Sequence, residues 1–252
     1  MRLVLLVVLV GLVACEKAPP EARKIDPAPV PPIVEPESPR VRYAAKTQNS
    51  AAGPNQTFFN IVEDESLFAV ADAGHPKSTG DPAKLAAQGV TPFPGARCAT
   101  SGPDVGEQLG CVVRDVNGLL LRGKLGTASL AVVTIEGWKA HVAVSGDASV
   151  VWIHARTGEI EIRTATHPQR PLGVTSTAEL ALFTLALDAG DRIAIVNRGL
   201  FETIGAAGIK GNLAGDFATP KHLEDAVNAL IGDAERIPDH PALTAIVLYV
   251  VP

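Results

Sequence analysis

The chain has 252 residues, with 22 Lys and Arg against 27 Asp and Glu and a formal net charge of −5. That charge, without a cluster of basic residues, argues against a nucleic acid as partner. About 210 residues follow residue 42, which is enough for one domain with a hydrophobic core.

The first residues have the pattern of a secretion signal. Met1 and Arg2 precede an apolar run, residues 3–14, which is too short to span a bilayer but suits the core of a signal peptide. The run closes in Leu12-Val13-Ala14-Cys15, which resembles the bacterial lipoprotein cleavage box. That resemblance implies cleavage after residues 1–14 and a lipid on Cys15 that holds the protein at a membrane. The alternatives are an ordinary signal peptide with an incidental cysteine and an uncleaved anchor.

Residues 15–42 are rich in proline and poor in large apolar side chains, with eight prolines between Glu16 and Arg40. Such a segment cannot bury enough surface to fold, so we predict an extended tether. A proline-rich ligand for a partner's groove is the alternative. The folded domain is then residues 43–252, lipid-anchored in a bacterial cell envelope and facing the periplasm or the cell surface.

The remaining pattern predicts an α+β domain of antiparallel strands with helices packed outside. Apolar runs between turn residues predict strands over residues 41–46, 57–62, 67–71, 128–135, 138–145, 149–155, 159–164, 180–187, 192–197 and 243–251. Helical apolar spacing predicts helices over residues 104–122 and 219–231, and a short one over residues 82–88. Gly146-Asp147 and residues 188–190 are expected to be hairpin turns.

One carboxylate ends a buried strand. The apolar run of residues 67–71 stops at Asp72, which Ala73 and Gly74 follow, where the backbone can turn sharply. A carboxylate in that place can hold a metal ion or a cationic group. Hydrogen bonding to the turn is the alternative.

Two cysteines, Cys98 and Cys111, remain when Cys15 is assigned to the lipid. An even number in an oxidising compartment predicts a disulfide, and their spacing is not that of a zinc site. The six histidines are scattered, without a pair at metal-ligand spacing.

Several short motifs, in this order, resemble those of the metal-dependent PPM-type protein Ser/Thr phosphatases over nearly the whole folded domain. They are Val70-Ala71-Asp72, Gly126-Thr127-Ala128, Val144-Ser145-Gly146-Asp147-Ala148-Ser149, Ala189-Gly190-Asp191-Arg192 and Asn197-Arg198-Gly199-Leu200. The resemblance implies a PPM-phosphatase-like sandwich of two antiparallel β-sheets flanked by helices. It also implies a pair of Mg²⁺ or Mn²⁺ ions, bridged by carboxylates, that activate a water for attack on a phosphate ester.

The metal ligands that this resemblance implies are mostly missing. Thr57 stands at one carboxylate position and Arg198 at another, and Ala73 replaces the glycine that follows the family's aspartate. Asp239 could stand for the last aspartate, but it lies two residues too far from Thr244. Spacing from Thr244 places Pro241-Ala242 there, and neither residue can bind a metal. Asp72 therefore remains with at most one other ligand aspartate.

These substitutions predict a membrane-tethered, catalytically inactive PPM-like module (a pseudophosphatase), without metal or cofactor, that binds an unknown protein partner outside the cytoplasm. The alternative is a weak or divergent protein Ser/Thr phosphatase that uses Mg²⁺ or Mn²⁺ on Asp72 and Asp239. We also expect Arg198 to form a salt bridge with Asp72 or Asp239, because a guanidinium can replace a dication electrostatically without supporting its chemistry.

Overall fold

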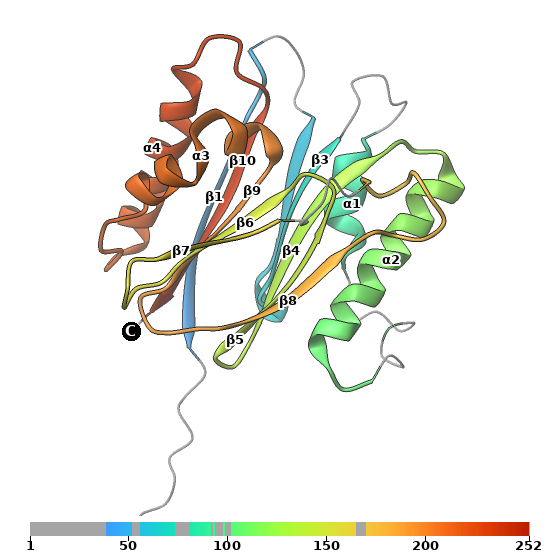
Figure 1. Cartoon of the computed structure of the whole chain (residues 1–252), viewed down its shortest axis with the longest axis horizontal. Coiled ribbons are helices and arrows are strands. Elements are labelled where there is room, and N and C mark those ends of the chain that lie inside the picture. The colour runs from blue at the N-terminus through green and yellow to red at the C-terminus, as the bar shows by residue number, and fades with distance from the viewer. Residues whose placement is uncertain are drawn as a thin grey trace, which may run out of the picture. The chain divides into compact units, whose positions relative to one another are not determined.

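Two five-stranded antiparallel sheets pack face to face, with helices on both outer faces (Figure 1). The computed structural model describes residues 39–51, 56–73, 81–91, 93, 98, 102–164 and 170–251. Cys15, the predicted signal and most of the predicted tether lie outside the described residues. Within the described part of the chain, no helix is both long and apolar enough to cross a bilayer.

Each sheet combines strands from distant parts of the sequence. Sheet A has the order β1 (Arg40–Gln48), β10 (Leu243–Val251), β9 (Arg192–Val196), β6 (Ser149–Ile153) and β7 (Ile160–Arg163). Sheet B has the order β2 (Thr57–Val62), β3 (Leu67–Ala73), β4 (Ala128–Glu136), β5 (Lys139–Ser145) and β8 (Ala181–Ala186). This architecture confirms the predicted α+β sandwich, and every predicted strand is present.

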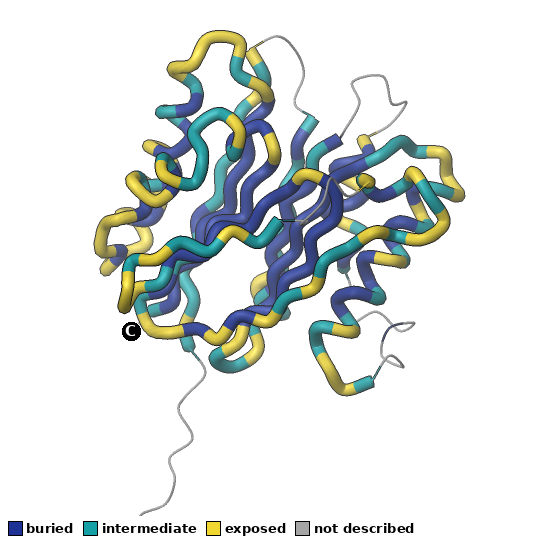
Figure 2. The backbone as a smooth tube through the Cα atoms, viewed as in Figure 1, coloured by how far each residue is buried: buried dark blue, intermediate teal, exposed yellow. Residues whose placement is uncertain are grey.

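The hydrophobic core forms three layers because side chains alternate between the faces of a strand. Phe68 and Val70 of sheet B meet Ile195 and Leu248 of sheet A between the sheets. The outer face of sheet B packs against α1 (Pro82–Gly89) and α2 (Val105–Gly123). The outer face of sheet A packs against α3 (Arg198–Asn212) and α4 (Pro220–Glu235). The central strands of both sheets are accordingly buried over most of their length, whereas the edge strands are mostly half-buried or exposed (Figure 2).

The helix starts follow from local chemistry. The Asp104 carboxylate accepts a hydrogen bond from Glu107 N at 2.9 Å and caps α2. Thr219 caps α4 by accepting from His222 N at 3.3 Å, and Pro220 occupies the first turn. Both are residue types that satisfy free N–H groups at a helix start, which is why the sequence predicts these two helices closely.

Two predicted hairpins are wrong. The turn at Gly146-Asp147 connects β5 in sheet B to β6 in sheet A, and residues 188–190 connect β8 in sheet B to β9 in sheet A. A glycine with positive φ, such as Gly146 at +70°, reverses the chain without specifying which sheet the next strand joins. The chain therefore crosses between the sheets at both places.

The helix α3 was not predicted. Its sequence contains Gly205, Gly208 and Gly211, and glycine lowers helix propensity by about 1 kcal/mol per residue relative to alanine. Gly205 interrupts the helix with φ 64° and ψ 175°, so the apolar spacing is broken there. Packing of Leu200 and Ile209 into the layer between α3, α4 and sheet A holds the helix in place.

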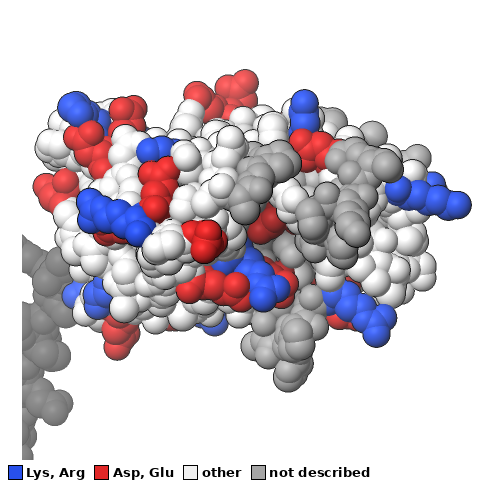
Figure 3. Space-filling view, turned by 90° about the horizontal axis from the view of Figure 1, so that it is seen from above, with Lys and Arg blue, Asp and Glu red and all other residues white. Residues whose placement is uncertain are grey.

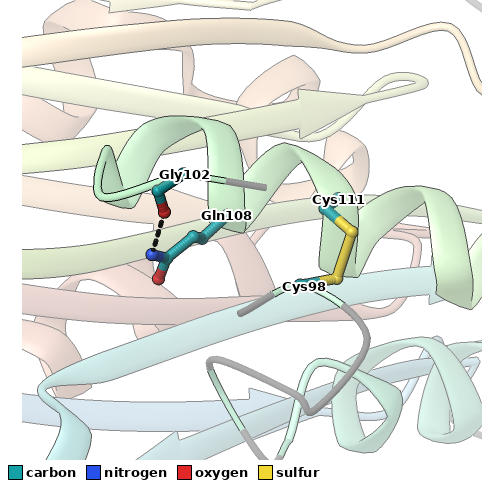
Figure 4. Close-up of a disulfide and its surroundings, with 4 residues drawn as sticks. All are labelled: Cys98, Gly102, Gln108 and Cys111. Atoms are coloured by element: carbon teal, nitrogen blue, oxygen red, sulfur yellow. Dashed lines mark hydrogen bonds between the residues drawn. A yellow bond between two sulfur atoms is a disulfide. The ribbon is translucent and has the colours of Figure 1, made fainter. Parts of the chain in front are cut away.

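The predicted disulfide between Cys98 and Cys111 is confirmed, with 5.7 Å between the Cα atoms (Figure 4). It links the segment that follows α1 to the second turn of α2. Close by, Gln108 Nε2 donates a hydrogen bond to the carbonyl oxygen of Gly102 at 2.6 Å, which secures the chain entering α2.

Candidate functional site

Polar side chains replace apolar ones at one end of the layer between the sheets. On β3, Phe68 and Val70 point into this layer, so the alternation places Asp72 on the same face. Asp72 is the register partner of Thr57 on β2 and of Ser129 on β4. Sheet B thus contributes a row of three polar residues across neighbouring strands.

Sheet A supplies a facing row. Thr47 of β1 and Thr244 of β10 are register partners. Asn197 follows β9, and its backbone N donates to the carbonyl oxygen of Thr244 at 3.2 Å. We call these six residues the polar cluster: Thr47, Thr57, Asp72, Ser129, Asn197 and Thr244. Thr47, Ser129, Asn197 and Thr244 were not predicted as site residues, because threonine and serine at strand ends are common and carry no charge.

Hydroxyl groups of the polar cluster join the two sheets. Thr244 Oγ1 lies 2.8 Å from Thr47 Oγ1 and also hydrogen-bonds Thr57 Oγ1, while Thr47 and Thr57 are 3.2 Å apart at the same atoms. Thr57 and Thr244 are buried. Thr57, at a position where the resemblance implies a metal-ligating carboxylate, is therefore engaged in neutral hydrogen bonds.

Asn197 is the connecting residue of the polar cluster. Its Nδ2 donates to Asp72 Oδ2 at 3.1 Å and to the carbonyl oxygen of Ala242 at 2.7 Å. Its Oδ1 accepts from Thr244 N at 2.9 Å and from Leu200 N at 3.2 Å, which caps α3. With only 1 % of its surface exposed, Asn197 is fixed by four hydrogen bonds. Asparagine is a favoured residue at a helix N-cap, so Asn197 was the available sequence signal for this helix start.

The Asp72 carboxyl is the acidic group of the polar cluster. Burial raises its pKa from 3.8 to about 6, because removal from water disfavours the charged form. The hydrogen bond from Asn197 and the positive charge of Arg198 lower the pKa, and the negative charge of Asp147 raises it. Near pH 7 the group is mostly ionised but close to its titration range.

The expected salt bridge from Arg198 to Asp72 or Asp239 is wrong. Arg198 Nη1 lies 3.2 Å from Asp147 Oδ2, and Nε donates to Glu202 Oε1 at 2.7 Å. The side chain is 56 % exposed, because Asn197 turns inward as the helix cap and the next residue points outward. The guanidinium still lowers the pKa of Asp72 through its charge, without contact.

The other two positions implied by the resemblance lie away from the polar cluster. Asp239 is exposed in the turn before β10, with φ 58°. The carbonyl of Ala242 lies at the polar cluster in its place. The side chain of Ala73 is buried among residues of α1 and α2, on the opposite face of sheet B from Asp72. The structure therefore brings together Thr57 and Asp72, places Arg198 nearby, and separates Asp239 and Ala73.

The polar cluster does not fit a two-ion metal centre. Hard dications need several oxygen ligands with negative charge, and the polar cluster supplies one carboxylate. In the part of the chain that the structure describes, no three His, Cys, Asp or Glu side chains gather as metal ligands would. Lys and Arg side chains lie beside Asp and Glu side chains on the face seen in Figure 3.

Comparison with known proteins agrees with this fold. PppA, a key regulatory component of T6SS in Pseudomonas aeruginosa, has a TM-score of 0.70 at 20% identity, covering 84% of this chain and 99% of its own. PstP/Ppp, a serine/threonine phosphatase of Mycobacterium tuberculosis, has a TM-score of 0.65 at 20% identity with the same coverage. The catalytic domain of PstP, solved in complex with two manganese ions, has a TM-score of 0.64 at 20% identity and again the same coverage.

No curated protein matches the chain. Residues 96–243, more than half of the chain, match the family described as Stage II sporulation protein E (SpoIIE). Together with the sandwich fold of the PPM phosphatases, this match shows that the chain belongs to the SpoIIE family of PPM-type proteins.

Proposed function

We propose that the protein is a membrane-tethered, catalytically inactive PPM-like module that binds a protein partner outside the cytoplasm. The observation that carries this proposal is the closed hydrogen bonding of Thr57 with Thr47 and Thr244 beside a single carboxylate, Asp72. A neutral hydroxyl supplies no negative charge to hold a dication, and these hydroxyls already satisfy one another.

Charge near the polar cluster also opposes metal binding. Arg198 is close enough to lower the pKa of Asp72, so a dication placed beside Asp72 would be repelled by the guanidinium. Asp147 and Glu202 partly neutralise that guanidinium, but both contact it rather than Asp72. One half-buried carboxylate without further anionic ligands does not support phosphate-ester hydrolysis by two metal ions.

A binding role is compatible with the comparisons. PppA shares the fold and is named as a regulatory component of T6SS. Regulation by a PPM-fold protein is therefore represented among the structural neighbours, and our proposal assigns this chain to regulation through binding. The tether and the lipid on Cys15 would place the domain at a membrane surface, where a partner is met.

The test is a phosphatase assay on the full-length chain with p-nitrophenyl phosphate and with a phosphothreonine peptide, in Mn²⁺ or Mg²⁺. We expect no metal-dependent release of phosphate above that of the matched variant Asp72→Asn. Metal-dependent hydrolysis that disappears in Asp72→Asn would overturn the proposal in favour of a divergent phosphatase.

A variant designed to gain metal binding tests directly whether missing carboxylates and the nearby Arg198 prevent it. Thr57→Asp combined with Arg198→Asp adds one carboxylate on the strand paired with Asp72 and replaces the nearby cation by an anion. Isothermal titration with Mn²⁺ should show binding by this variant and none by the wild-type chain. Tight Mn²⁺ binding by the wild-type chain would contradict the argument.

A further inference from the structure

Strand β1 is the edge of sheet A, paired on one side with β10. The direction of its free backbone groups follows from the hydrogen bonds of β10. Asn197 N donates to Thr244 O, and Val250 N donates to Asp191 O, so even-numbered residues of β10 direct their backbone groups to β9. The odd-numbered residues of β10 therefore pair with β1.

The register then fixes which residues of β1 are paired. Tyr249 pairs with Arg42, Val247 with Ala44 and Ala245 with Lys46. Backbone groups alternate sides along an antiparallel strand, so the N–H and C=O groups of Val41, Tyr43 and Ala45 point to the free edge. Among the described residues, no hydrogen bond reaches these groups. All three residues are only half-buried.

This free edge lies in a groove. A cavity of about 450 Å³ is lined by Tyr43 and Ala45 of β1, by Phe59 and Ile61 of β2, and by Glu224 and Val227 of α4. The groove is therefore bounded by β2, the edge strand of sheet B, on one side and by α4 on the other.

A second cavity extends the groove along β1. It measures about 480 Å³ and is lined by Val41, Tyr43, Phe68 and Ile135 together with the polar residues Glu63 and Ser66. Tyr43 and Phe68 form an aromatic pair with 5.5 Å between ring centroids. Side chains of an added strand that point between the sheets would thus meet Tyr43, Phe68 and Ile135, with the Glu63 carboxylate held by the Tyr43 hydroxyl beside them.

The even-numbered side chains of β1 lie on the face opposite Val41, Tyr43 and Ala45, and this face is positively charged. Arg40, Arg42 and Lys46 share that face, and Glu224 is the acidic residue that lines the groove there. Arg42 donates to the carbonyl oxygens of Phe217 and Ala218, both at 2.7 Å, and forms no salt bridge with any carboxylate in the described part of the chain. Acidic residues opposite these cations would stabilise an added strand.

We infer that the free edge of β1 receives an extended strand of a partner protein whose side chains alternate between apolar and acidic. The backbone of Val41, Tyr43 and Ala45 pairs with that strand, as an edge strand beside a groove does in peptide recognition. Its apolar side chains face Tyr43, Phe59 and Ile61. This inference rests on the proposed binding function and names the docking site and the partner's chemistry.

A second copy of the chain fits this edge poorly. If two β1 strands paired antiparallel with Tyr43 opposite Tyr43, the known side-chain alternation would place Arg40 of one copy opposite Lys46 of the other. Like charges directly opposite destabilise a strand pair. The charge pattern therefore favours an acidic strand over self-association.

The test uses the full-length chain in mild detergent and a fluorescein-labelled peptide of about ten residues in which Val and Glu alternate. Fluorescence anisotropy should show binding. Ala45→Pro removes an N–H at the free edge without removing one from the β10 ladder, and should weaken binding about tenfold or more. A peptide with Lys in place of Glu should bind about tenfold more weakly or worse.

The matched control is Ala186→Pro. Leu187 N donates to Trp138 O, so the N–H of Ala186 on β8 points to the free edge of sheet B. This variant makes the same substitution at an equivalent edge position and should bind the peptide within about twofold of wild type. Equal weakening by both variants would overturn the inference.

Hydrogen exchange gives a readout that needs no variant. Addition of the Val-Glu peptide should protect the amides of Val41, Tyr43 and Ala45, whereas those of Arg42 and Ala44 are already protected by β10. Absence of peptide binding, or protection elsewhere only, would overturn the inference. So would a dimer that forms without peptide and is lost in Ala45→Pro, which would identify a second copy as the occupant. Metal-dependent hydrolysis would overturn the proposed function but not the strand binding, so the two failures are distinguishable.

Discussion

Asp72 should make the stability of the domain depend on pH. Its pKa rises from 3.8 to about 6 on folding, so the folded state favours the protonated form. The stability that this preference contributes is complete below about pH 4 and is lost as the pH rises through about 6. Asp72→Asn should therefore raise the free energy of unfolding by up to about 3 kcal/mol at pH 8 and have little effect at pH 4. Urea unfolding of both proteins at the two pH values measures this difference.

Arg198→Ala provides the control for that measurement. Its side chain is 56 % exposed and its ion pairs are on the surface, so the loss should be below about 1 kcal/mol. Removing its charge should also raise the pKa of Asp72 further, which NMR titration would show. If the difference between wild type and Asp72→Asn were the same at pH 4 and pH 8, the account of Asp72 would be wrong.

At the scale of single residues, the sequence located two members of the polar cluster and not the others. Thr57 and Asp72 follow from short motifs that lie on paired strands. The direction of the Arg198 side chain could not be predicted from the sequence. It depends on the position of Asn197, which is held by Thr244 and Ala242 far along the chain. A side chain's direction at a helix start is set by tertiary contacts that a linear pattern does not contain.

At the scale of elements, the disulfide should hold the segment before α2. Cys98 and Cys111 are separated by 13 positions, and closing a loop of that size stabilises by about 3 kcal/mol in the chain-entropy model. Replacing both with alanine should lower the free energy of unfolding by about that amount. Chemical denaturation measures the loss.

The bridge itself can be checked by chemistry. Alkylation of unreduced protein from its native compartment should find neither Cys98 nor Cys111 modified, and both modified after reduction. Two alkylated cysteines without reduction would show that the bridge is absent in the cell.

Strands and their approximate ends were predictable because alternation and turn residues are local properties. The sheet to which each strand belongs could not be predicted in the same way. β5 and β6 are separated by a short glycine turn typical of a hairpin, yet they lie in different sheets. α3 was missed for a related reason, since packing outweighs the low helix propensity of its glycines.

At the scale of the whole molecule, the attachment to a membrane remains a prediction, because Cys15 lies outside the described residues. Cys15→Ala should leave the membrane fraction or keep its signal segment, since one lipidated residue with several acyl chains supplies durable anchoring. Fractionation followed by mass spectrometry of the N-terminus measures both outcomes. A wild-type protein found in the soluble fraction with an unmodified N-terminus would refute the prediction.

The hydrogen bonds of Asn197 also bear on the order of folding. They join it to Asp72, Ala242 and Thr244 across 125, 45 and 47 positions of sequence, so the cap of α3 depends on contacts of long range. Long loops must close before such contacts can form, and that entropy is lost early. The cap bond from Leu200 N is local, so we expect α3 to start early but Asn197 to become fixed only when β3, β9 and β10 are in position, which φ-values at Asn197 would measure.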